Sequence, residues 1–216
     1  MARGRPRKAL LSTESIVDTA LRQIDAGKPL NMSSIARELS VHVSSLYNHV
    51  GDREGLIEQL RLRISHEYPV PPLDGLSWQQ ALRAVGTTIH AAFSAHPGLV
   101  PYLATVPVSA PEITAVYTRL AEIMLAAGHS ARTAALAIRM VDSMAIGSAM
   151  VISSDPAPWS DAEEGGRALI GASANWDDEL ALTAEAFERS LGYAIRGLED
   201  ELDEPGEPDE PGEPAA

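Results

Sequence analysis

Short hydrogen-bonding side chains gather between residues 43 and 49, in the run VSSLYNH. The amide of Asn48 can form two hydrogen bonds to the edge of an adenine, and a serine hydroxyl can reach several bases. The apolar Val43 can contact the methyl group of a thymine. Side chains of this kind are suited to reading the edges of DNA bases.

Two short helices would have to position these side chains. The first is predicted to follow Asn31, whose side-chain oxygen can cap a helix, and its pattern breaks at Ser40. The second carries an apolar stripe at helical spacing, formed by Val43, Leu46, Tyr47 and Val50. Helices joined by so tight a turn must cross steeply, which predicts a helix-turn-helix whose second helix enters the major groove.

The stretch from Ser12 to Leu60 resembles the DNA-binding domain of the TetR (tetracycline repressor) family. The resemblance rests on ESIVDTALRQIDAG, on IAREL at 35–39, on LYNHV at 46–50, and on the charged run DRE at 52–54. Ser40 stands where the family usually has glycine. A left-handed residue other than glycine costs about 1–2 kcal/mol, so either the turn is slightly strained or Ser40 avoids a positive φ.

The resemblance implies roles for the residues that match the family's DNA-facing positions. The positions that face base edges are Val43, Ser44, Ser45 and Asn48, and those whose polar ends bind phosphates are Tyr47 and His49. Three further DNA-facing positions are Ser33, Ser34 and Arg53. Two alternatives remain: Tyr47 can be a core residue with only its hydroxyl outside, and His49 can be a solvated histidine.

Charge is distributed unevenly along the 216 residues. Residues 1–67 hold 10 basic and 8 acidic residues, whereas residues 68–216 hold 7 and 22, which makes the net charge −13. The segment 1–10 is a basic arm, which either contacts DNA or solubilises the chain. The segment 203–216 is an acidic tail rich in proline and glycine, and is predicted to be disordered. Such asymmetry is typical of a protein with one nucleic-acid-binding end.

Composition and motifs narrow the class of protein. The absence of cysteine excludes disulfides and thiolate metal sites. We find no metal-binding, P-loop, GxSxG or dinucleotide motif, so no catalytic residue, metal or cofactor is expected. We expect no apolar run to reach the roughly 20 residues that a membrane helix needs, which indicates a cytoplasmic protein without a membrane partner.

The remaining chain is predicted to be helical, which makes the fold all-α: a helix-turn-helix domain at 11–68 and a ligand-binding and dimerisation domain at 73–202. The stretch 133–152 is apolar nearly all round. A second predicted helix has apolar residues at heptad-like spacing from Leu180 to Leu198. The two resemble the helices that this family pairs with a second copy, which predicts a homodimer contact through Ala145, Ala149, Leu180, Ala184, Phe187, Leu191, Ala194 and Leu198. The alternative is that this seam packs within one chain.

An apolar effector pocket is expected among the C-terminal helices. Methionine adapts to varied ligands, and a few polar groups could orient one. The candidate lining residues are Trp78, Ile89, His90, Phe93, Tyr102, Tyr117, Met140 and Met144, and each could instead be ordinary core. The predicted function is a ligand-responsive regulator, most simply a repressor, that binds a double-stranded palindromic operator as a dimer and is released by a small molecule. The alternative is a DNA-binding regulator without a ligand.

Overall fold

The computed structural model describes residues 11–152 and 179–203, and every regular element in those ranges is a helix, as predicted. In chain order these are α1 (Thr13–Asp25), α2 (Met32–Glu38), α3 (Val43–Val50), α4 (Arg53–Glu67), α5 (Trp78–Ala95), η1 (Pro97–Leu99), α6 (Val100–Leu103), α7 (Pro111–Ala126), α8 (Ala131–Ile152) and α10 (Glu179–Asp203). The predicted basic arm, and the acidic tail beyond Asp203, lie outside the described residues.

Local capping determines where the first helices begin. Ser12 accepts a hydrogen bond from the Ser15 amide at 3.1 Å, and Asn31 accepts one from the Ser34 amide at 2.9 Å. Each satisfies a backbone donor that the first turn leaves unpaired. Between α2 and α3, Ser40 has φ +57°, so the left-handed turn conformation predicted as one of two outcomes is the one adopted.

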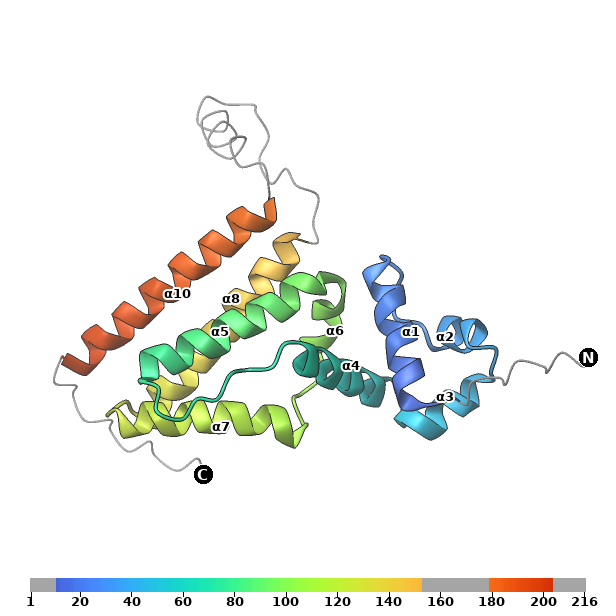
Figure 1. The fold of residues 1–216 in the computed structure, drawn as a ribbon, viewed down its shortest axis with the longest axis horizontal. Coiled ribbons are helices and arrows are strands. Elements are labelled where there is room, and N and C mark those ends of the chain that lie inside the picture. The colour runs from blue at the N-terminus through green and yellow to red at the C-terminus, as the bar shows by residue number, and fades with distance from the viewer. Residues whose placement is uncertain (1–10, 153–178, 204–216) are drawn as a thin grey trace, which may run out of the picture.

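The helices α1 to α4 enclose a first hydrophobic core, which we call the head. Its fully buried side chains include Ile16, Ile35, Leu46, Leu56, Ile57 and Leu60. Leu99 and Leu103 from η1 and α6 join the same core. The head is therefore attached to the rest of the molecule in two places, through α4 and through the η1–α6 segment (Figure 1).

The body is a second core built from α5, α7, α8 and α10. Figure 1 shows α10 lying alongside α8 and α5. Gly86 permits this close packing, because a Cβ there would lie 3.2 Å from side-chain atoms of both Leu191 and Val141. Phe187 and Leu191 of α10 are almost completely buried in this core.

Two expectations require correction. The S-x-x-E spacing of Ser109 and Glu112 in the sequence predicts a capping box at the start of α7, but the helix begins at Pro111 after Ala110, without a side-chain cap. The stretch Ala131–Ile152 is long and apolar enough, by length and composition, to cross a membrane, contrary to the expectation that no such run exists. In this structure α8 instead packs against α5, α7 and α10, and Ala137, Val141 and Ala145 belong to the body core.

Candidate functional site

The second helix of the helix-turn-helix, α3, separates an inner from an outer face. Leu46 and Val50 are buried in the head, whereas Ser44, Asn48 and His49 are exposed. The Tyr47 side chain is 43% exposed, so it does not fill the core. Residues 44, 47 and 48 share one helical face and form a continuous polar surface. The two other candidates on α3, Val43 and Ser45, are half-buried.

The candidates outside α3 flank that surface. Ser33 on α2 is exposed, and Ser34 is half-buried, with its amide donating to the cap Asn31. Arg53 is exposed at the start of α4, and its guanidinium lies 5.4 Å from the ring centroid of Tyr102. Arg53 therefore also belongs to the contact between head and body.

The junction between α3 and α4 depends on two glycines. Gly51 ends α3 with φ +77°, a conformation that favours glycine. A Cβ at Gly55 would collide with the carbonyl of Val50, while the amide of Gly55 donates to Asp52 at 2.7 Å. This close packing fixes the orientation of α3 relative to α4.

Two cavities lie where the body meets α4. Their volumes are about 240 Å³ and about 650 Å³. Both are lined by Arg61, Phe93, Val108 and Tyr117, so they meet at a common wall. The larger volume is within the range of small-molecule sites, and the smaller one falls just below that range. Of the predicted lining residues, Phe93 and Tyr117 line both cavities and Ile89 lines the smaller one.

The other five pocket candidates line neither cavity. Trp78 is buried in the body, where its ring meets His129 edge-on at 4.5 Å. His90 stacks on Phe187 at 4.2 Å. The hydroxyl of Tyr102 accepts a hydrogen bond from the Leu30 amide at 3.0 Å, at the junction with the head. Met140 is exposed and Met144 packs on the body core. Helical spacing of apolar residues cannot separate a core position from a cavity wall.

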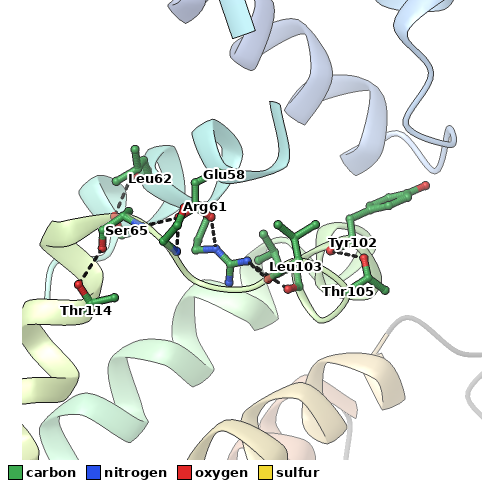
Figure 2. Close-up of polar contacts among 11 residues, drawn as sticks. Glu58, Arg61, Leu62, Ser65, Tyr102, Leu103, Thr105 and Thr114 are labelled. Carbon is green, nitrogen blue, oxygen red and sulfur yellow. Dashed lines mark hydrogen bonds and ion pairs between the residues drawn. The ribbon is translucent and has the colours of Figure 1, made fainter. Parts of the chain in front are cut away.

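A polar clamp, formed by Glu58 and Arg61 of α4, is the feature that sequence reasoning missed (Figure 2). Arg61 donates from Nη2 to the carbonyls of Leu103 at 3.2 Å and Val106 at 2.6 Å, and from Nε to Glu58 at 2.8 Å. Oε1 of Glu58 accepts from the Ser109 amide and hydroxyl and from the Ala110 amide. The clamp therefore joins α4 to residues 103–110, which lead from α6 into α7.

The electrostatics of the clamp favour a charged Glu58. Burial alone would raise the pKa of this carboxyl, but the hydrogen bonds from Ser109, Arg61 and Ala110 outweigh burial and lower it. Both side chains are nearly enclosed, with 11% of Arg61 and 13% of Glu58 exposed. Hydrogen bonds between these two side chains and backbone groups offset part of the cost of enclosing the charged pair.

A second polar pair faces the larger cavity. The Tyr117 hydroxyl donates to Asp142 at 2.9 Å. Burial raises the pKa of Asp142, although Tyr117, Arg139 and Arg61 act in the opposite direction. Burial, and then the charge of Asp142, raises the pKa of Tyr117. Asp142 therefore has Tyr117, on the neighbouring helix α7, as its hydrogen-bond partner.

The predicted dimer residues are already buried within one chain. Ala145, Ala149, Phe187, Leu191 and Leu198 are each at most 4% exposed. Ala184 and Ala194 are half-buried, and the side chain of Leu180 lies outside the described residues. The buried members of the heptad-like seam therefore pack inside the body of one chain, and their contact with a second copy stays a prediction. The exposed large side chains of α8 and α10 include Leu136, Met140 and Tyr193.

Comparisons with known proteins agree with this architecture. A family model described as "Tetracyclin repressor-like, C-terminal domain" matches residues 71–202. An HTH-type transcriptional regulator of Saccharopolyspora erythraea is 26% identical over 143 residues, which cover 65% of this chain and 61% of that protein. The chain thus aligns with less than two thirds of that relative.

Two solved structures share the fold over most of the chain. ActR of Streptomyces coelicolor in complex with actinorhodin has a TM-score of 0.69 at 22% identity, covering 92% of this chain and all of that one (100%). A variant of TetR from Acinetobacter baumannii in complex with minocycline has a TM-score of 0.67 at 18% identity, covering 89% and 98%. At these identities the similarity shows a common fold.

Proposed function

The chain belongs to the TetR (tetracycline repressor) family of helix-turn-helix transcriptional regulators, and we propose that it is a ligand-responsive repressor without enzymatic activity. In this proposal the head binds a palindromic operator through the exposed face of α3. A small, largely apolar effector binds the body and releases the DNA. The protein acts in the cytoplasm, and its two-domain division follows the predicted limits of 11–68 and 73–202.

The observation that carries this proposal is the position of Arg61. It belongs to α4, whose Leu56, Ile57 and Leu60 are core residues of the head, and it lines both cavities of the body. A ligand in either cavity is in contact with the helix that supports the DNA-facing surface. The solved complexes of ActR with actinorhodin and of TetR with minocycline support effector binding in proteins of this fold.

We further propose that two copies associate through α8 and α10. Leu136, Met140 and Tyr193 are exposed apolar or aromatic side chains on these helices. A Cβ at Gly147 or Gly197 would meet open space, so a partner helix can approach closely there. Burial against a second copy also explains why α8 is so apolar without a membrane partner. A two-fold dimer requires a palindromic operator.

Selection of DNA from a random library, followed by fluorescence anisotropy, tests this function. The expected result is an inverted repeat whose half-sites are separated by about one or more helical turns. Addition of a confirmed effector should release the bound DNA from the protein. A selected site without two-fold symmetry would contradict the dimeric repressor. The cavities favour this function over a regulator without a ligand, for which a filled body would be expected.

A further inference from the structure

We propose that the effector is an organic anion, with an apolar ring system and a carboxylate-like or sulfonate-like group, and that Arg61 binds its charged group. This inference rests on the proposed function and specifies the chemistry of its ligand. It follows from the position of one guanidinium at the wall that the two cavities share. The same group holds the segment that joins α6 to α7.

Arg61 has hydrogen-bonding capacity left over. Its Nε donates to Glu58, and its Nη2 donates to the carbonyls of Leu103 and Val106. Within the described residues, Nη1 makes no hydrogen bond. A guanidinium carries five N–H donors in a planar fork that matches the oxygens of a carboxylate or similar anion. Arg61 can therefore accept an anion from the cavity side while its Nε contact with Glu58 remains.

The charges around the cavities favour an anion over a cation. Oε1 of Glu58 accepts hydrogen bonds from Ser109 and Ala110, and its Oε2 accepts one from Arg61. Glu58 lines neither cavity, so its carboxylate offers no acceptor to a bound cation. Asp142 accepts a hydrogen bond from the Tyr117 hydroxyl, and burial raises the pKa of its carboxyl. Arg139 adds a second guanidinium to the larger cavity.

The remaining acidic and histidine side chains that line the cavities, His66 and Glu112, lie at the smaller cavity and are hydrogen-bonded to each other. His66 and Glu112 lie 2.9 Å apart there, and both side chains are largely exposed. The rest of the walls is mainly apolar, with Phe93, Val108 and Ile138 among the lining residues. Apolar surface of this kind binds an aromatic ring system and strengthens an ion pair by excluding water.

Anion binding would act on the head through the clamp. An anion that draws the guanidinium toward the cavity competes with the two carbonyls for Nη2. One carbonyl belongs to Leu103, the last residue of α6, and the other to Val106 in the segment that follows. The helix α6 contacts the head through Tyr102, whose hydroxyl accepts a hydrogen bond from the Leu30 amide and whose ring lies beside Arg53. The ligand thus loosens one of the two attachments between head and body at the moment that Arg61 binds it.

A matched pair of dyes tests the charge requirement on the full chain. 8-Anilinonaphthalene-1-sulfonate and N-phenyl-1-naphthylamine share the same rings, and only the first carries an anionic sulfonate. Both fluoresce in apolar sites, so each affinity can be measured by titration. We expect Arg61→Met to lower the ratio of sulfonate-dye to neutral-dye affinity by roughly tenfold or more, because a charge-assisted contact is lost.

Three further variants make the outcomes decisive. Arg61→Lys keeps the charge without the fork, so the ratio should fall less. Arg119→Met removes an exposed arginine on α7 that lines neither cavity and should leave the ratio unchanged. Ala135→Trp fills the larger cavity, which Ala135 lines, and should weaken both dyes. Thermal melting shows whether each variant is folded. If Arg61→Met does not fold, the dye-affinity ratio of Arg61→Lys decides whether Arg61 binds the anionic group.

An unchanged ratio in the folded Arg61 variants would overturn the proposal. If the neutral dye still binds in an Ala135-dependent manner in that case, the ligand-responsive function stands and only the anion assignment fails. If neither dye binds the wild-type chain, both the anion assignment and the proposed use of the cavities fail.

Discussion

At the residue scale, Tyr47 and Asn48 are neighbours on the exposed face of α3 but offer different chemistry. The amide of Asn48 can distinguish bases, whereas the hydroxyl of Tyr47 is suited to a phosphate oxygen. We expect Asn48→Ala to lower the preference for the operator over other DNA by about 1–3 kcal/mol. We expect Tyr47→Ala to lower the affinity for all DNA sequences alike. Tyr47→Phe isolates the hydroxyl if the alanine variant also disturbs packing.

Fluorescence anisotropy with operator and scrambled DNA at two salt concentrations separates these effects. The phosphate contact should change the salt dependence of binding, and the base contact should change the ratio of the two affinities. Wild-type affinity for both DNAs in both variants would place the reading surface on another part of the head.

We expect His90 to make the stability of the body depend on pH. Its ring stacks on Phe187, and burial lowers its pKa, although Glu188 acts in the opposite direction. The unfolded chain therefore binds a proton more readily than the folded chain. The contribution of the neutral His90 ring to the stability of the body is fully present above the pKa of about 6.5 that histidine has in the unfolded chain. This contribution is lost as the pH falls from there toward the lower pKa of His90 in the folded chain.

We expect the melting temperature to fall between about pH 7.5 and about pH 5.5, and to fall less in His90→Phe, which keeps a ring but cannot titrate. His129 contributes in the same direction, because burial lowers its pKa as well. Replacement of the exposed His42 by glutamine serves as the control. A pH dependence that is identical in wild type and His90→Phe would show that this ring does not titrate in the relevant range.

At the element scale, the clamp formed by Glu58 and Arg61 holds the start of α7 in place of a local cap. Glu58→Gln keeps the shape but removes the charge, and we expect it to lower the free energy of unfolding by about 1–3 kcal/mol. Because the pKa of Glu58 is lowered, the difference should be full above about pH 4.5 and shrink as the pH falls through the folded pKa.

Urea denaturation at several pH values measures this difference. Glu122→Gln is a suitable control, because Glu122 is an exposed partner of Arg119 elsewhere on α7. Equal destabilisation by the two substitutions would mean that the clamp contributes no more than a surface ion pair.

The α3–α4 junction supplies a second element-scale prediction. A methyl group at Gly55 would collide with the backbone carbonyl of Val50, which cannot move without shifting the end of α3. We expect Gly55→Ala to cost about 1–3 kcal/mol of stability, as overpacking usually does. It should also weaken operator binding, because α3 would be displaced. An unchanged melting temperature would show that the junction accommodates the methyl group.

Helix boundaries could be predicted where the determining residues are close together in sequence. Ser12, Asn31, Asp52 and Ser130 each accept a hydrogen bond from the amide three residues later, as expected of capping residues. The start of α7 could not be predicted, since Glu58 lies more than fifty residues before the amides that it binds. The role of Arg61 in the cavity walls could not be predicted for the same reason. Arg61 lines the cavities only because α4 packs against the body.

At the scale of the whole molecule, the apolar residues of α10 serve the fold of one chain. The spacing of Phe187, Leu191 and Leu198 correctly indicated a helix with one apolar face, but spacing does not tell whether that face meets its own chain or a second copy. The structure answers this by burying all three in the body. Any association of copies through α8 and α10 has to use the outer residues of these helices.

This distinction changes the prediction for the homodimer. Phe187→Asp and Leu191→Asp place a charge inside the body core and should unfold the chain rather than yield a native monomer. Leu136→Glu combined with Met140→Glu places charges on the outer face of α8, where the side chains are 50% and 42% exposed. This double variant should remain folded and sediment as a monomer at about micromolar concentration, whereas wild type sediments as a dimer.

Leu125→Glu is the matched control, because Leu125 is 47% exposed on α7, outside the proposed contact. It should leave the dimer intact. Since a palindromic operator is bound by two linked heads, the folded monomer should also lose most of its operator affinity while its affinity for an isolated half-site is retained. A wild-type chain that sediments as a monomer at this concentration, or a double variant that remains dimeric, would remove α8 from the interface.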